Sequence, residues 1–307
     1  MKQEIIIVGG NSFAGKTILP HLLSHYEKVH VVCRSKADFP PHSNLQIYVT
    51  DDLASDRIKQ AIENCNAGLY FATATTPATS ASNPLLELDQ NVKPLVSFLD
   101  LIQHKRYFTL IYISSGGTIY GNAVSGPIKE HQPFSPRSYY AAGKIAGESF
   151  VHAFSRQTGN NTIILRPSNF YGVGQPYTQN FGLIRTVFER LVNNESITIW
   201  GDGENRRDFL YIEDFISACI FLLQRTHDEK VQTFNVSNGT SVSLNRVCDL
   251  IEKITGQRLA RVYKPIRQID VKNVELDSTK IRQLGWSPKI SIERGLQLMW
   301  EWIRNNK

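Results

Sequence analysis

Short apolar runs alternate with helix-like segments through the first half of this 307-residue chain, and this alternation restricts the possible folds more than any other feature. Because the apolar runs are continuous, they favour strands of a parallel sheet that is covered on both faces. We therefore predict an α/β fold with a doubly wound parallel sheet. The predicted strands are Glu4–Val8, Val29–Cys33, Leu45–Val49, Gly68–Ala72, Phe108–Ser114 and Thr162–Arg166, and the predicted helices are Ala14–Tyr26, Leu85–Ile102 and Tyr139–Arg156.

The texture of the sequence changes after Pro167, where loops rich in Gly, Asn and Pro separate shorter elements. The length fits one large domain or two smaller ones. We predict a first domain of residues 1–167, to which residues 207–235 return, and a smaller C-terminal α/β domain of residues 168–206 and 236–307.

Charge and cysteine content exclude several classes of protein. The net charge is +6, but the basic residues are scattered, which argues against a nucleic-acid partner and suits a small anionic substrate. Cys33, Cys65, Cys219 and Cys248 form no C-x-x-C pair and have no histidine cluster beside them, so we expect neither a metal site nor a disulfide framework. No signal peptide is recognisable, and no segment has the roughly 18 apolar residues of a membrane span. These features predict a cytoplasmic protein.

A glycine-rich turn, Gly9-Gly10-Asn11-Ser12-Phe13-Ala14-Gly15, joins the first predicted strand to the first predicted helix. Such a turn presents backbone N–H groups and a helix N-terminus to a pyrophosphate, as in the Rossmann-type dinucleotide site. Ser12 stands where the middle glycine of the G-x-x-G-x-x-G spacing is usual, and its hydroxyl can donate to a phosphate. A tight strand–helix turn without a ligand is the alternative for this feature taken alone.

The end of the second predicted strand indicates which dinucleotide binds. An NAD site usually has an acidic side chain there, but this chain has Cys33-Arg34-Ser35-Lys36. A guanidinium suits a 2′-phosphate, so we favour NADP(H), with NAD(H) as the alternative. Arg34 stacking on adenine or pointing to solvent is the competing interpretation. The segment Asp51-Asp52-Leu53 after the third strand would contact adenine or cap a helix.

Tyr140 and Lys144 lie one helical turn apart and therefore on the same face of their predicted helix. An ammonium beside a phenol favours the phenolate and lowers the tyrosine pKa, which gives an acid/base that works near neutral pH. A hydroxyl from Ser115 or Thr118 would hold the substrate oxygen. These groups suit the oxidation of an alcohol or the reduction of a ketone against a nicotinamide.

Taken in order, these segments resemble the extended short-chain dehydrogenase/reductase family (NAD-dependent epimerase/dehydratase), whose members act on nucleotide sugars. The nearest branch resembles the UDP-glucose-4-epimerase-like proteins of polysaccharide and O-antigen gene clusters. The resemblance covers nearly the whole chain. It is carried by Gly9–Gly15, Asn91-Val92, Ser114–Gly121, Tyr140–Lys144, Leu165–Gly172, Trp200–Phe209 and Leu284–Pro288.

The resemblance implies roles for individual residues. Tyr140 is the expected acid/base, and Lys144 is expected to hold the nicotinamide ribose. Asn169 and Arg207 would contact the substrate diphosphate, Arg267 and Asp270 would lie near the diphosphate and nucleoside, and Trp200 near the nucleobase. The implied cofactor contacts are Gly9, Asn11, Ser12, Phe13, Ala14, Gly15, Arg34, Ser35, Asp52, Leu53, Ala72, Thr73, Ser114, Tyr140, Lys144 and Pro167. The implied substrate contacts are Thr75, Ser115, Thr118, Asn169, Leu183, Trp200, Arg207, Arg267 and Asp270.

Two activities fit the resemblance. We favour an NADP(H)-dependent 4-reductase of a 4-keto-6-deoxy sugar nucleotide, because Arg34 and the absence of an acid at Cys33 argue for a phosphate and for cofactor exchange. A 4-epimerase with retained NAD is the alternative. Gly116 replaces the serine that many members use, and no carboxylate pair follows it, which argues against a dehydratase. A non-catalytic NADP sensor is a third possibility, against which the presence of Tyr140 and Lys144 argues.

The resemblance also implies an assembly. The helices Leu85–Ile102 and Tyr139–Arg156 pair across a two-fold axis in many relatives, which predicts a homodimer joined by a four-helix bundle. The apolar residues considered for that contact are Leu86, Val92, Leu95, Phe98, Phe150 and Phe154, and all of them also suit packing on the sheet.

Overall fold

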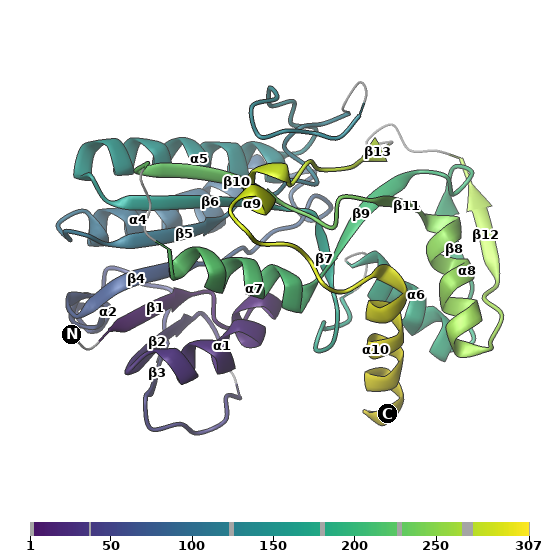
Figure 1. Cartoon of the computed structure of the whole chain (residues 1–307), viewed down its shortest axis with the longest axis horizontal. Helices are drawn as coiled ribbons and strands as arrows, with labels where there is room; N and C mark the ends of the chain where they lie inside the picture. The colour runs from purple at the N-terminus through teal and green to yellow at the C-terminus, as the bar shows by residue number, and fades with distance from the viewer. Residues whose placement is uncertain are drawn as a thin grey trace. The chain divides into compact units, whose positions relative to one another are not determined.

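The computed structural model describes residues 3–36, 38–122, 126–178, 182–225, 229–265 and 273–306 (Figure 1). The chain divides into two compact units. The first contains Met1–Ser114, Ser138–Leu165 and Cys219–Phe234, and the second contains Ser115–Arg137, Arg166–Ala218 and Asn235–Lys307. This division differs from the predicted domains at two places: residues 115–137 group with the second unit, and the return to the first unit begins at residue 219 rather than 207.

The first difference has a local cause. The segment after Ser115 bonds to second-unit residues, because the Gly116 N–H donates to the Pro167 carbonyl (2.9 Å) and the Arg166 guanidinium donates to the Tyr120 hydroxyl (2.7 Å). The second difference arises because β9 (Arg206–Tyr211) pairs with β7 (Asn169–Tyr171) and β11 (Ser241–Ser243), not with the large sheet.

Seven strands form the large sheet in the order β10-β6-β5-β4-β1-β2-β3 (Figure 1). The pairings of β1 with β2 and β4, of β2 with β3, and of β5 with β4 and β6 are parallel, which confirms the predicted doubly wound sheet. The chain order reverses between β1 and β4, and in such sheets ligands bind beyond the carboxyl ends of the strands at that point. The strands are β1 (Glu4–Val8), β2 (Lys28–Cys33), β3 (Leu45–Val49), β4 (Cys65–Tyr70), β5 (Thr109–Ile113), β6 (Asn161–Pro167) and β10 (Val231–Val236).

One face of this sheet packs on α2 (Asp56–Glu63), α4 (Lys93–Ile102) and α5 (Tyr139–Thr158). Their apolar residues join those of the strands in one buried cluster, in which Phe98 and Phe108 are fully inaccessible. Fully burying each such side chain stabilises the fold by about 1.5–3 kcal/mol. Ile18 and Leu22 of α1 (Phe13–His25) are equally buried but lie outside this cluster.

Serine side chains fix the start of the helices that matter for the site. The Ser12 hydroxyl accepts from the Gly15 N–H at the start of α1, and the Ser138 hydroxyl accepts from the Ala141 N–H at the start of α5. Gly159, at φ 73°, ends α5 in the left-handed conformation that glycine adopts most readily. The frame that positions Tyr140 is therefore set by local sequence.

Two predicted elements were wrong in detail. The segment Leu85–Ile102 is not one α-helix: α3 (Pro84–Glu87) passes through a π-helical turn, Leu88–Val92, into α4. The Lys93 N–H reaches back to the Leu88 carbonyl, and Pro94 has no N–H with which to continue the α-helical pattern. β4 runs over Cys65–Tyr70 rather than Gly68–Ala72, because pairing with β1 extends from Glu4 opposite Cys65 to Val8 opposite Tyr70.

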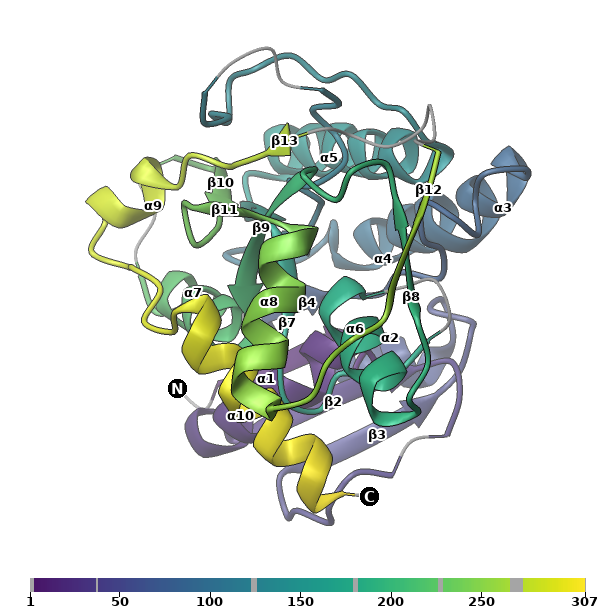
Figure 2. The ribbon, with the colours of Figure 1, turned by 90° about the vertical axis from the view of Figure 1, so that its right-hand side faces the viewer.

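The described residues of the second unit form two small sheets. β7, β9, β11 and β13 (Asn273–Val274) form one, and β8 (Ile197–Trp200) pairs in parallel with β12 (Arg261–Lys264). α8 (Leu244–Thr255) contacts α6 (Leu183–Val192) and α10 (Ile292–Asn305) (Figure 2). The remaining helices are α7 (Ile212–Leu223) and α9 (Thr279–Gln283). Across the described residues, none of the helices has the length and apolarity needed to cross a membrane.

Candidate active site

The glycine-rich turn brings the ends of β1 and β4 so close together that only glycine is tolerated. Gly9 has φ +91°, and a Cβ there would lie 2.4 Å from the Ala72 nitrogen. A Cβ at Gly15 would lie 2.6 Å from the Gly9 carbonyl oxygen, so the last glycine allows α1 to approach the turn closely. Tight turning and close helix packing are what the glycines of a dinucleotide turn provide. Ser12 accepts from the Gly15 N–H (3.0 Å), which leaves its own proton available for a phosphate oxygen.

Two polar atoms of the predicted cofactor residues have no partner in the described structure. They are Asn11 Oδ1 and Ser114 Oγ, and both are buried. Buried polar atoms are nearly always hydrogen-bonded, so these two fit a polar ligand that completes their bonding. Phe13 and Ala14 lie at the start of α1. Ala72 and Thr73 follow β4, where Ala72 is half-buried and Thr73 is exposed. Pro167 is buried, and its carbonyl accepts from Gly116.

The end of β2 carries exposed cationic residues. Arg34, Ser35 and Lys36 are exposed, whereas Cys33 is buried. The Asn11 amide donates to the Ser35 carbonyl (2.8 Å) and hydroxyl (3.2 Å), which ties this segment to the glycine-rich turn.

Two residues after β3 show mainly structural contacts. The Asp52 carboxylate accepts from the Ala54 N–H at 2.9 Å, and Leu53 is buried in the core cluster. Asp52 therefore caps its own turn but not a helix, since Ser55 is the N-cap residue of α2, and its contact with adenine stays a prediction.

Tyr140 and Lys144 lie together as helical spacing predicts. Lys144 is buried, its Nζ donates to the Ile113 carbonyl (2.9 Å), and the same atom lies 5.8 Å from the centre of the Tyr140 ring. Burial lowers the pKa of Lys144 to about 8, while the charges of Glu87 and Glu148 act in the opposite direction. Tyr140 is partly exposed, and its N–H donates to the hydroxyl of fully buried Ser80 (3.1 Å). A cationic ammonium is therefore held beside a phenol that remains accessible.

Thr75 occupies a different environment from the one predicted. It is 3% exposed, and its hydroxyl donates to Glu87 Oε2 (2.5 Å) and accepts from the Asn91 amide (2.6 Å). The hydroxyl of Thr75 is thus already bonded to Glu87 and Asn91, and its contact with a substrate stays a prediction. Asn91 also accepts from the Ala74 N–H (2.7 Å), so it braces the loop after β4.

The turn Ser115–Thr118 lies in the second unit and holds a pair of hydroxyls. Thr118 Oγ1 donates to Ser115 Oγ at 2.9 Å, which leaves the Ser115 proton free to reach a substrate oxygen. Gly116 is buried, and a Cβ there would lie 2.3 Å from Leu276 Cδ1 and 2.8 Å from the Arg166 carbonyl oxygen. Both hydroxyls that the sequence offered are therefore present, and position 116 has no room for one.

Three further substrate candidates belong to the second unit. Asn169 is exposed, and its Oδ1 lies 2.9 Å from where a Cβ of Gly117 would be, so it adjoins the Ser115–Thr118 turn. Arg207 is half-buried in β9, two residues before the partner of Asn169 in the β7–β9 pairing. Trp200 is half-buried, with Lys264 Nζ 5.5 Å from the centre of one of its rings.

The positions of the other predicted substrate residues add little to the description of the site. Leu183 is the half-buried first residue of α6. Arg267 and Asp270 lie outside the described residues.

Comparison with known proteins identifies the family. The profile of the NAD dependent epimerase/dehydratase family matches residues 5–237. The chain belongs to this family. A protein of Methanocaldococcus jannaschii described as a putative UDP-glucose 4-epimerase is 28% identical over 98% of this chain and 99% of its own length. The dTDP-4-dehydro-6-deoxyglucose reductase of Escherichia coli is 27% identical over 99% of this chain and 98% of its own.

Solved structures agree. The UDP-glucose 4-epimerase of Thermotoga maritima, crystallised with UDP-glucose, has a TM-score of 0.91 and 28% identity over 99% of each chain. Thus the relatives of this epimerase/dehydratase family member are nucleotide-sugar epimerases and reductases, and the prediction of an enzyme of the extended short-chain class is confirmed.

The close packing around Gly116 explains why this family member has no serine at that position. We expect Gly116→Ser to lower the free energy of unfolding by about 1–3 kcal/mol, because overpacking a filled site forces its neighbours to move. Denaturant titration would measure the loss. Gly117→Ser is the matched control, since its Cβ would meet only the end of the Asn169 side chain. Equal midpoints for Gly116→Ser and the parent would show that Leu276 can move aside.

Sequence reasoning overlooked two buried residues of this family member's first unit. Glu87 and Ser80 are 2% and 0% exposed, and both contact α5: Ser80 accepts from the Tyr140 N–H, and Glu87 packs against Gly143. The signal for Glu87 was an isolated acid in the apolar run Leu85-Leu86-Glu87-Leu88. Nothing in the sequence around Ser80 distinguishes it from an ordinary loop serine.

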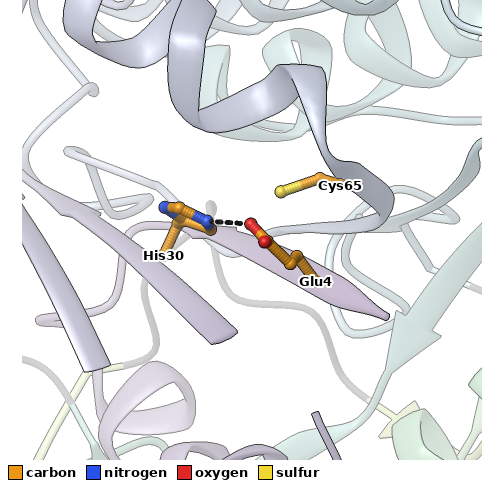
Figure 3. Close-up of side chains that lie close together, drawn as sticks. All are labelled: Glu4, His30 and Cys65. Carbon is orange, nitrogen blue, oxygen red and sulfur yellow. Dashed lines mark hydrogen bonds and ion pairs between the residues drawn. The ribbon is translucent and has the colours of Figure 1, made fainter. Parts of the chain in front are cut away.

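A group of metal-binding residue types lies near the amino ends of β1, β2 and β4 (Figure 3). Potential ligand atoms of Glu4, His30 and Cys65 come within 4.8 Å of one another. His30 Nε2 lies 2.8 Å from Glu4, and the Cys65 thiol donates to the Ala61 carbonyl at 3.1 Å. Burial raises the pKa of Cys65 to about 12, which disfavours the thiolate that a metal requires. Each of the three side chains takes part in a hydrogen bond within the first unit.

Proposed function

We propose that this enzyme is an NADP(H)-dependent oxidoreductase that acts at C4 of a nucleoside-diphosphate sugar, as a 4-reductase of a 4-keto-6-deoxy sugar nucleotide. The observation that carries this proposal is the end of β2, where exposed Arg34 and Ser35 take the place of a carboxylate. A guanidinium there favours a 2′-phosphate and allows the cofactor to exchange after each turnover. The Escherichia coli relative, a dTDP-4-dehydro-6-deoxyglucose reductase, supports the same reaction.

The residues of the chain supply the proton and hold the carbonyl. NADPH, when bound, provides the hydride that reaches C4. Tyr140 donates its phenolic proton to O4 as the carbonyl becomes an alcohol, and Lys144 stabilises the phenolate that remains. Ser115 donates a hydrogen bond to the same oxygen, and Thr118 orients Ser115. Asn169 and Arg207 bind the diphosphate, a task suited to the guanidinium fork.

A nucleotide-sugar 4-epimerase with retained NAD is the second candidate. It is favoured by the backbone likeness, with a TM-score of 0.91, to the Thermotoga maritima UDP-glucose 4-epimerase. The Thermus thermophilus UDP-glucose 4-epimerase, a structural neighbour with a TM-score of 0.89, was solved with NAD. Tyr140, Lys144 and Ser115 would serve this reaction equally well. Identifying the cofactor and the substrate would therefore distinguish the 4-reductase from the 4-epimerase.

The deciding experiment mixes purified protein with NADPH and a dTDP-4-keto-6-deoxyhexose and follows NADPH absorbance. Stoichiometric consumption supports the reductase. No consumption, together with interconversion of UDP-glucose and UDP-galactose or of their N-acetylated forms, supports the epimerase. The four buried free cysteines suit a reducing compartment, and we propose that the enzyme works in the cytoplasm.

We also propose that two copies form a dimer through a four-helix bundle, to which each copy contributes α5 and the segment of α3, the π-helical turn and α4. Leu95, Phe98 and Phe154, among the residues considered for this contact, are buried in the core, whereas Phe150 is exposed. Leu85 and Leu88 are exposed as well, at 65% and 51%. Apolar side chains gathered on an outer helical face are typical of an interface between subunits.

Light scattering tests the dimer. We expect twice the 34.8 kDa chain mass for the parent and the single-chain mass for Leu88→Asp combined with Phe150→Asp, because two carboxylates would lose water inside the contact. Val262→Asp changes an exposed valine of the second unit and should leave the mass unchanged. A parent of single-chain mass would remove the proposal.

A further inference from the structure

Glu87 is a buried acid whose hydrogen bonds come from neutral groups. It ends α3 and is 2% exposed. Its carboxylate accepts from the Thr75 hydroxyl (2.5 Å) and from the Asn91 amide (2.9 Å). An ionised carboxylate out of water is costly unless a positive charge compensates it. A cation nearby would offset this cost.

Helix α5 makes room for this carboxylate at Gly143. A Cβ at that position would lie 2.3 Å from Glu87 Oε1 and 2.5 Å from its Cγ. Glycine inside a helix costs about 1 kcal/mol relative to alanine. The acid thus occupies the space that any other residue would need, one residue before Lys144 on the same helix.

Lys144, the residue after Gly143, is a buried cation. Its ammonium is buried and, within the described residues, donates to the carbonyl of Ile113. In the described structure the rings of Tyr112 from β5 and Tyr140 from α5 lie beside it, with centres 5.5 Å and 5.8 Å from Nζ. The charges of two acids also act on it: Glu87 of α3, which packs against the adjacent Gly143, and Glu148 of α5. Burial lowers the pKa of Lys144, and of the two acids that raise it Glu87 has the larger effect.

We propose that Glu87 is a positioning residue of the reaction: its buried charge keeps Lys144 protonated at neutral pH, and Gly143 is glycine in order to admit that charge. The inference rests on the proposed function of the Tyr140–Lys144 pair. Thr75 and Asn91 hold the carboxylate in place and join it to the loop after β4. Glu87 thus acts through Lys144, and Lys144 acts on the phenolate.

The direct test is the titration of Lys144 itself. Protein labelled with ¹³C at lysine Cε is titrated by NMR without substrate or cofactor, and Lys144→Arg assigns the signal. We expect Glu87→Gln, which removes the charge but keeps the shape, to lower the titration midpoint by about one pH unit. Glu148→Gln should lower it less. Thr75→Val removes a hydrogen bond but no charge and should leave it within the precision of the measurement.

The pH profile of the reaction gives the second measurement. Activity that needs protonated Lys144 is lost as pH rises through its midpoint, so the alkaline limb in Glu87→Gln should move to lower pH by the same amount. A purely structural role would lower the melting temperature without moving either midpoint, and that result would overturn the proposal.

Two further points keep the test decisive. If Glu87→Gln does not fold, Gly143→Ala replaces it, because the added methyl group pushes the carboxylate away; an unchanged Lys144 midpoint then overturns the proposal. The NMR titration of Lys144 needs no enzymatic turnover. It can therefore test the role of Glu87 independently of the proposed 4-reductase function. A shifted midpoint in a protein that reduces no sugar would contradict the proposed function alone, whereas an unshifted midpoint in an active enzyme would contradict the role of Glu87 alone.

Discussion

Replacing Tyr140 with phenylalanine is expected to lower the rate of 4-keto reduction by about 10²–10⁴-fold, the usual contribution of a positioned proton donor. Phenylalanine keeps the ring that lies 5.8 Å from Lys144 Nζ and removes only the hydroxyl. The fold and the binding of the dinucleotide should therefore persist. Single-turnover NADPH consumption measures the rate, and quenching of protein fluorescence by NADPH measures binding.

The preceding residue of the same helix supplies the control. Tyr139 is 45% exposed, begins α5 and carries the same phenol, so Tyr139→Phe should reduce the ketone at the parental rate. If Tyr140→Phe kept more than about a tenth of the rate, the loss would fall below the range for general acid catalysis. The proton would then come from the Ser115–Thr118 pair or from water, and Tyr140 would be a packing residue.

The residues that sequence reasoning placed well are those fixed by short-range geometry. Tyr140 and Lys144 are one turn apart on any α-helix, and Gly9 must be glycine wherever β1 ends against β4. The parallel sheet follows from apolar runs that need no knowledge of their partners.

The features that sequence reasoning did not find depend on contacts between residues that a local pattern does not show. Thr75 is buried because its hydroxyl donates to the carboxylate of Glu87. No sequence pattern within the loop after β4 shows which of its side chains are buried. The π-helical turn adds a residue that a 3.6-residue period cannot show, although Pro94 marked the place. Ser115 and Thr118 could be named as candidates, but their hydrogen bond and the crowding at Gly116 exist only in the folded chain.

Removing the guanidinium of Arg34 is expected to weaken NADPH binding by about 10–100-fold, since a hydrogen bond to a charged group contributes about 1.5–3 kcal/mol. NADH has no 2′-phosphate, so its binding to Arg34→Ala should change by less than about twofold. The ratio of kcat/KM for the two cofactors measures the effect, and the preference for NADPH should fade as salt is added because Arg34 is exposed.

Lys36→Ala is the control that distinguishes a specific contact of Arg34 with the 2′-phosphate from a general attraction between positive charges and the cofactor. Lys36 is an exposed cation two residues further along, whereas the neighbouring Ser35 is tied to Asn11 of the glycine-rich turn. We therefore expect only a small change for Lys36→Ala. If Arg34→Ala weakened NADPH and NADH equally, Arg34 would stack on the adenine that both cofactors share. A parent enzyme that prefers NADH would remove the argument for cofactor exchange, and the epimerase with retained NAD would then be the better explanation of the Tyr140–Lys144 site.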